Sequence, residues 1–179
     1  MRDWVPVPGS TKGRLALLAL AEFGTRGYDA VSVTRLAAAA GVTTGSLYHH
    51  FGNKAGLYGF VREEAERRLI DRMEGAAAAV GGRGQGAAVR MALLVGFDFA
   101  VRERFAALLA EPHPERASDP VERFLARLTE RASSPLSRLL AATWRAALAE
   151  ATRGSAKEVR AALDALLPDV ALVPLVPTV

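Results

Sequence analysis

The stretch from Gly41 to Lys54, GVTTGSLYHHFGNK, restricts the fold of this chain more than any other part of it. Gly41 can adopt the left-handed backbone that closes a helix. Thr43 can then cap a new helix, because its hydroxyl can accept from free backbone N–H groups. Leu47 and Phe51 lie four residues apart, so both can face one small core. The stretch therefore predicts a tight turn followed by a short helix.

Another short helix is predicted immediately before this turn. Ser32 is a favourable N-cap, and apolar side chains recur after it at helical spacing. These apolar residues are Val33, Leu36, Ala37 and Ala40. Two short helices joined by a glycine turn are typical of a helix-turn-helix.

The outward face of the helix after the turn contains no carboxylate. It presents hydroxyls, imidazoles and one glycine, from Thr44, Gly45, Ser46, Tyr48, His49 and His50. Hydroxyl and imidazole groups can donate to phosphate oxygens or base edges, and a glycine lets the backbone approach DNA closely. Asn53 is predicted to cap a third helix, whose free N–H groups would bind a phosphate together with Lys54. This pattern favours a DNA-binding surface.

Residues 11–58 resemble the DNA-binding domain of the TetR family of bacterial transcriptional regulators. The residues that carry the resemblance occur in the order of the family's motif. They are Phe23, the run 27–33 (GYDAVSV), Leu36, Ala37, the run 40–42 (AGV), the run 45–51 (GSLYHHF), Asn53, Lys54 and Leu57. An ordered set over about a quarter of the chain is more specific than a bare helix-turn-helix pattern.

The resemblance implies an all-α fold in two parts. Residues 1–58 would form a three-helix DNA-binding domain that contains the helix-turn-helix, and residues 59–179 a helical bundle for ligand binding and dimerisation. The implied function is that of a homodimeric repressor that binds a palindromic DNA operator and is released by a small-molecule effector. By resemblance and position, bases are expected to be contacted by Thr34, Thr44 and Tyr48, and phosphates by Ser32, Arg35, Ser46, His49, His50 and Lys54.

Helical spacing of apolar residues predicts further helices over residues 11–25, 53–79, 87–110, 121–132, 133–152 and 156–167. The segment 81–86 is rich in glycine and is predicted to be a loop. Gly56 and Gly59 weaken the start of the long helix 53–79. Gly56 also departs from the family, whose members tend to have an acidic residue there that completes a capping box. Local flexibility is therefore predicted at this point.

Asp98 falls on the predicted inner stripe of helix 87–110, where a carboxylate needs a partner. Two partners remain open, an arginine of the protein or a group on a bound ligand. Asp98 is therefore the first polar candidate for an effector pocket. The other candidates are Met91, Phe97, Phe105 and Trp144, for which the alternative is a place in the core.

The last two predicted helices correspond by position to the pair that forms the dimer interface in the TetR family. Small alanines among leucines allow close helix approach. The alternative is that this stripe packs into the chain's own core. The apolar tail from Pro168 to Pro177 is expected to lie across the body or the partner subunit. In the N-terminal arm, Arg2 could reach into a minor groove, or the arm could be a frayed terminus.

Composition narrows the function classes. The chain has 179 residues, half of them hydrophobic, and no cysteine, which excludes disulfides and thiolate metal sites. No apolar run is long enough to span a bilayer, so a cytoplasmic protein without a membrane partner is expected. Residues 1–60 hold six basic and three acidic side chains, so three of the four excess positive charges lie there. This asymmetry fits a nucleic-acid-binding segment on a neutral body.

An enzyme is not expected, and neither is a bound cofactor or metal. Two of the three histidines stand on the predicted recognition helix, and the third, His113, is isolated in a predicted loop. No Ser-His-Asp arrangement or metal-binding carboxylate cluster can be proposed from the spacing. Two alternatives remain: a DNA-binding regulator without an effector, and a protein-binding helical module in which DNA contact is secondary.

Overall fold

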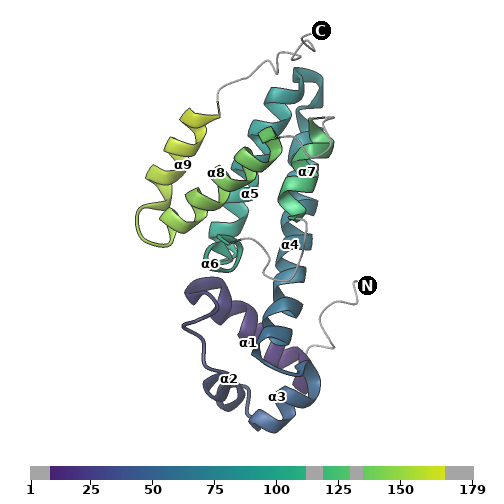
Figure 1. Cartoon of the computed structure of the whole chain (residues 1–179), viewed down its shortest axis with the longest axis vertical. Coiled ribbons are helices and arrows are strands. Elements are labelled where there is room, and N and C mark those ends of the chain that lie inside the picture. Colours follow the sequence, from purple (N-terminus) through teal and green to yellow (C-terminus); the bar gives the residue numbers. More distant parts are fainter. Residues whose placement is uncertain (1–8, 112–118, 130–134, 168–179) are drawn as a thin grey trace.

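The computed structural model describes residues 9–111, 119–129 and 135–167, and the regular secondary structure in these ranges is entirely helical (Figure 1). The predicted all-α fold is therefore confirmed. The helices are α1 (Thr11–Arg26), α2 (Val33–Ala39), α3 (Thr44–Phe51), α4 (Lys54–Ala79), the 3₁₀ helix η1 (Gly81–Arg83), α5 (Gln85–Arg102), α6 (Ala106–Leu109), α7 (Pro120–Leu128), α8 (Pro135–Ala151) and α9 (Ala156–Leu166). The expectations for Arg2, His113 and the tail from Pro168 concern residues outside the described ranges.

Helices α1 to α3 pack together at one end of the molecule, and we call them the head (Figure 1). Helix α4 begins in contact with the head and continues without a break beside α5. It therefore also packs with α5, α6 and α7. We call α5 to α9 the body. The predicted domain boundary after residue 58 falls inside α4, so the head and the body share one helix.

An aromatic cluster fills the junction between the head and α4. The ring of Tyr58 meets Phe23 edge to face with centroids 5.1 Å apart, and it meets Tyr28 in the same way at 5.0 Å. Phe23 and Leu47 are fully buried, as their helical spacing predicts. Edge-to-face aromatic pairs add to the stabilisation from burial. The cluster therefore fixes α1 to the start of α4.

Close packing also joins the long helices of the body. A Cβ atom on Gly96 of α5 would come within 2.9 Å of the Cγ atom of Met73 in α4, so the absent side chain lets these helices approach. Helix α8 is attached to α5 through Trp144, whose buried indole Nε1 donates to the carbonyl oxygen of Leu93 at 3.0 Å. The body core thus extends across α4, α5 and α8.

The predicted single helix over residues 87–110 is wrong, because α5 ends at Arg102 and α6 begins at Ala106. Arg104 has φ +62°, a left-handed conformation that residues other than glycine seldom adopt. The backbone N–H of Phe105 donates to the carbonyl oxygen of Ala100 at 2.7 Å and closes α5. Apolar spacing continues through this break, so periodicity alone conceals it. The predicted loop 81–86 also differs, since η1 lies in it and α5 begins at Gln85.

Asp98 lies on the surface and not on the buried stripe that its spacing predicts. Its side chain is 46% exposed, and both carboxylate oxygens accept from Nε of Arg160 in α9, at 2.7 and 2.9 Å. The sequence left two partners open for Asp98, an arginine of the protein or a group on a ligand. The structure shows an arginine, Arg160. These hydrogen bonds raise the pKa of Arg160 above its ordinary value. A second ion pair, Arg90 with Asp164 at 2.5 Å, also ties α9 to α5.

Candidate nucleic-acid interface

Side-chain caps set the boundaries of the two short helices in the head. Ser32 Oγ accepts from the backbone N–H of Arg35 at 3.5 Å, and Thr43 Oγ1 accepts from that of Ser46 at 3.1 Å. Between the helices, Gly41 has φ +67°. The predicted caps at Ser32 and Thr43 and the predicted turn at Gly41 are therefore confirmed. Helices α2 and α3 therefore form a helix-turn-helix.

The orientation of α3 is fixed by Leu47, which is fully buried against the head core. The opposite face is accessible to solvent, and Tyr48 is 45% exposed. The rings of His49 and His50 lie edge to face with centroids 5.4 Å apart. The predicted α3 site residues are all exposed or partly exposed: Thr44, Gly45, Ser46, Tyr48, His49 and His50. A surface with hydroxyl and imidazole donors is available to phosphates or base edges.

The predicted site residues of α2 share the exposed surface of the head. Ser32, Thr34 and Arg35 are all exposed. A small cavity of about 120 Å³ between α1 and α2 is lined in part by Ser32 and Arg35. These residues are therefore accessible, and their contacts with DNA stay predictions.

Lys54 has a partner that its sequence position does not reveal. Its Nζ lies 4.3 Å from the ring centroid of Tyr28, and Lys12 Nζ lies 5.0 Å from that of Phe60. A cation over an aromatic face is attracted by the ring quadrupole. Tyr28 thus holds the Lys54 ammonium beside the first turn of α4, where a phosphate contact is predicted.

The family tends to have an acidic residue where this chain has Gly56, and the close approach of α3 to α4 explains this difference. Asn53 caps α4, and its Oδ1 accepts from the backbone N–H of Gly56 at 2.8 Å. A Cβ atom on Gly56 would come within 2.1 Å of the carbonyl oxygen of Phe51, the last residue of α3. No side chain fits at this point. Position 56 therefore needs glycine for packing, a reason that the sequence does not show.

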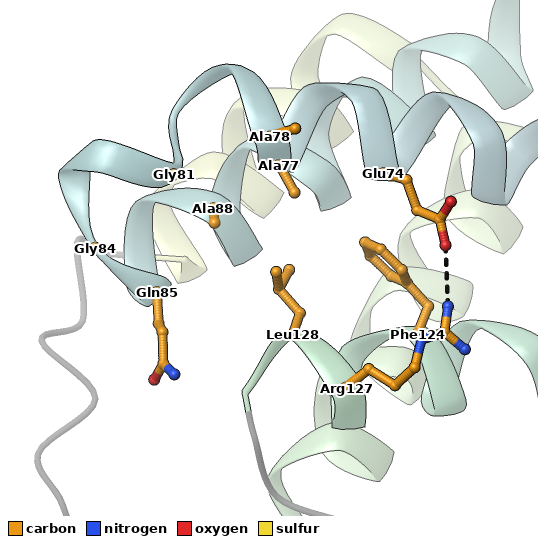
Figure 2. Close-up of a pocket in the computed structure, with 10 residues that line it drawn as sticks. All are labelled: Glu74, Ala77, Ala78, Gly81, Gly84, Gln85, Ala88, Phe124, Arg127 and Leu128. Atoms are coloured by element: carbon orange, nitrogen blue, oxygen red, sulfur yellow. Dashed lines mark hydrogen bonds and ion pairs between the residues drawn. The ribbon is translucent and has the colours of Figure 1, made fainter.

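A groove of about 430 Å³ opens at the end of the body where α4 leads into α5 (Figure 2). Glu74 and Arg127 form an ion pair at 3.0 Å beside it. The lining is otherwise mostly apolar or small, and it comprises Glu74, Ala77, Ala78, Gly81, Gly84, Gln85, Ala88, Phe124, Arg127 and Leu128. Alanine and glycine give no sequence signal for a cavity, so sequence reasoning missed this groove.

The predicted effector residues lie elsewhere. Phe97, Phe105 and Trp144 are buried in the core, Met91 is partly buried, and Asp98 is paired with Arg160. None of them lines the groove. The structure does not bring them together around a described cavity, and their role in effector binding stays a prediction.

Two other features are absent from the described residues. No group of three or more histidine, aspartate or glutamate side chains within the described ranges could hold a metal ion. None of the helices in those ranges is both long and apolar enough to cross a membrane.

Comparisons with known proteins agree with this geometry. The sequence profile of the family described as "Bacterial regulatory proteins, tetR family" matches residues 18–59. The HTH-type transcriptional repressor KstR2 of Mycobacterium tuberculosis is 49% identical over 45 residues, which cover 25% of this chain and 22% of that protein. The repressor AcnR of Corynebacterium jeikeium is 39% identical over 49 residues, which cover 27% and 26% of the two proteins. The matched segment spans about a quarter of the length of these curated relatives.

The likeness in fold extends beyond the matched segment. A crystal structure described as a TetR family transcription regulator from Shewanella sp. PV-4 superimposes with a TM-score of 0.62 at 20% sequence identity. The superposition covers 88% of this chain and 96% of that chain. The head and the body are therefore arranged as in that protein.

Proposed function

Since the chain belongs to the TetR family of bacterial regulatory proteins, we propose that it is a transcriptional regulator that binds a partly palindromic DNA operator as a homodimer. The observation that carries the proposal is the face of α3 opposite Leu47, which is accessible and contains no carboxylate. Tyr48 is positioned to contact a base edge, and His49 and His50 to donate to phosphates. Lys54 adds a positive charge at the first turn of α4.

Exposed apolar side chains on α8 and α9 support the homodimer. Leu139 of α8 is 65% exposed and Leu166 of α9 is 67% exposed. Neither packs into the chain's own core, whereas Leu148 of α8 and Leu163 of α9 do, so the core takes only part of the predicted stripe. Exposed alanines continue the same faces, at Ala142 and Ala146 of α8 and Ala162 and Ala165 of α9. A second copy of the chain would cover these residues in a four-helix contact.

A dimer would place two copies of α3 on one side of the assembly. To enter successive major grooves, the two recognition helices must lie about 34 to 36 Å apart. The names of KstR2 and AcnR describe repressors, which supports repression as the mode of action of this chain.

The groove between α4, α5 and α7 supports a small-molecule effector. Its volume of about 430 Å³ lies within the usual range for ligand pockets. Phe124 and Leu128 provide apolar contact, and Gln85 provides a hydrogen-bonding amide (Figure 2). A ligand that binds better to a body conformation that moves the heads apart would release DNA by a population shift.

The test is binding of the purified protein to DNA from its own upstream region, measured over a range of salt concentrations. Sequence-specific binding that weakens steeply with salt is expected. His50→Ala and Lys54→Ala should both weaken it. Lys157→Ala should not, because Lys157 is exposed on α9, a helix that lies far from α3 (Figure 1). Absence of specific binding at low salt would contradict the proposal. Binding of a protein partner with little salt dependence would instead favour a protein-binding module.

A further inference from the structure

Helix α6 depends on its neighbours for stability. It contains only the four residues Ala106–Leu109, too few for an isolated helix to persist in water. The carbonyl groups at its C-terminal end lack partners within the helix and form the negative end of its dipole. Positive side chains from other helices can satisfy these carbonyl groups.

Two buried arginines from different helices donate to carbonyl groups at this end of α6. Arg62 of α4 is fully buried and Arg145 of α8 is 5% exposed. Arg62 Nη1 donates to the carbonyl oxygen of Leu108 at 2.7 Å, and Arg145 Nη1 donates to that of Leu109 at 2.5 Å. Both guanidinium groups also donate to one further atom, the carbonyl oxygen of Glu111. Helices α4 and α8 are thus joined through a single backbone oxygen at the end of α6.

Each arginine also has its own counter-charge. Arg62 Nε lies 2.9 Å from Glu66 Oε1, and Arg145 Nη2 lies 2.6 Å from Asp119 Oδ2. Asp119 in turn caps α7, because its Oδ1 accepts from the backbone N–H of Val121 at 2.8 Å. Breaking a buried pair leaves an uncompensated charge. The arrangement therefore favours one relative placement of α4, α6, α7 and α8.

The turn before α6 presses directly on the head. A Cβ atom on Gly24 of α1 would come within 2.2 Å of the carbonyl oxygen of Arg104. In addition, Tyr58, which packs on Phe23 of α1, accepts from Arg62 Nη1 at 2.8 Å. The two arginines consequently hold a segment against which α1 rests.

We propose that Arg62 and Arg145 are positioning residues that set the angle between the head and α8, and thereby select the operator half-site spacing that the dimer accepts. This inference rests on the proposed function, in which α8 forms part of the dimer contact. In that assembly α8 contacts the partner subunit. A change in the angle between head and α8 in each chain therefore changes the distance between the two α3 helices. A guanidinium group donates in a fixed planar fork, whereas the lysine ammonium is a compact charge on a flexible stem.

The direct test compares Arg145→Lys with the control Arg153→Lys, which makes the same change at an exposed ion pair just beyond α8. Operator duplexes with half-sites one base pair closer or farther apart are titrated with each protein. The wild-type chain and Arg153→Lys are expected to prefer one spacing by about tenfold. Arg145→Lys should still bind that duplex, with the preference reduced to about threefold or less.

A second measurement tests the angle without DNA and within a single chain. The chain has no cysteine, so Ala39→Cys on α2 and Thr152→Cys beyond α8 place one spin label on each side of the arginine pair. With labelled protein diluted into unlabelled protein, electron–electron distances within one chain are measured. A narrow distance distribution is expected for the otherwise wild-type chain and for Arg153→Lys, and a broader or shifted one for Arg145→Lys.

The outcomes separate the two proposals. If the wild-type chain binds no operator while the label distances respond to Arg145→Lys, the proposed function fails and the control of the head angle stands. If the wild-type chain selects a spacing and Arg145→Lys selects it equally, the inference is overturned. Unchanged label distances in folded Arg145→Lys, with folding checked by thermal unfolding, would also overturn it.

Discussion

Gly56 lies so close to the carbonyl oxygen of Phe51 that a Cβ atom at position 56 would come within 2.1 Å of that oxygen. This contact joins the end of α3 to the first turn of α4 through backbone atoms alone. The position of the recognition helix on α4 is therefore sensitive to one added methyl group.

Gly56→Ala is expected to destabilise the protein by about 1 to 3 kcal/mol, because α3 must move to relieve the overlap. DNA binding should weaken by more than the loss of folded protein accounts for, since the displaced helix is the one proposed to contact DNA. Thermal unfolding and DNA titration check the two effects.

Gly59→Ala is the matched control for that substitution. It lies one turn further along α4, and a Cβ atom there would have no neighbour within 4 Å. Alanine should stabilise the helix by about 0.5 to 1 kcal/mol relative to glycine. A similar loss of stability in both variants would contradict the role assigned to the Phe51 contact.

Tyr48→Ala is expected to reduce specific DNA binding about tenfold or more while leaving non-specific binding nearly unchanged, because the exposed ring is proposed to contact a base. Leu17→Ala is a suitable control, since Leu17 is another large exposed side chain of the head but lies on α1. Titration with operator and with unrelated DNA measures both affinities. An equal loss for the two kinds of DNA would show that Tyr48 makes only a sequence-independent contact.

Leu139→Glu is expected to convert the homodimer into a monomer, because the charge would be buried without a partner in the proposed contact. Sedimentation equilibrium at several protein concentrations measures the change. Leu17→Glu introduces the same charge at an exposed leucine of the head and should leave the assembly intact. A dimer that persists in Leu139→Glu would place the interface on another surface.

Ala78→Trp is expected to fill the groove and abolish binding of an apolar ligand. The neighbouring Ala79→Trp serves as control, because Ala79 is exposed on the same helix but does not line the groove. Fluorescence of the uncharged probe N-phenyl-1-naphthylamine reports binding. Loss of the signal in Ala78→Trp alone is expected, and equal signals in both variants would mean that the probe binds elsewhere.

Local interactions made much of this fold predictable from the sequence. Ser32, Thr43, Asn53 and Asp119 each cap a helix within three residues of their own position, so the neighbouring sequence contains the whole signal. The accessible face of α3 follows from a buried residue, Leu47, in the same helix. In such cases the residues whose interaction decides the local structure lie close together in the sequence.

Interactions between distant segments could not be predicted in this way. The break at Arg104 accompanies a contact with Gly24, eighty residues earlier in the chain, and Asp98 depends on Arg160. Apolar periodicity places Leu139 on an inner stripe, but it does not distinguish a core from an exposed surface such as the proposed dimer contact. Only the spacing of Tyr58, Arg62 and Glu66, four residues apart, offers a sequence signal for the buried arginine of α4.

Helix α4 runs without a break from the head into the body, so a small rotation of α4 at its body end displaces the head. A helix of 26 residues is about 39 Å long, since each residue adds about 1.5 Å. A rotation of about 5° about one end of such a rod displaces its other end by about 3.4 Å, the distance between neighbouring base pairs of DNA. In the proposed regulator, a few degrees of rotation of α4 would therefore be enough to move α3 out of register with the operator.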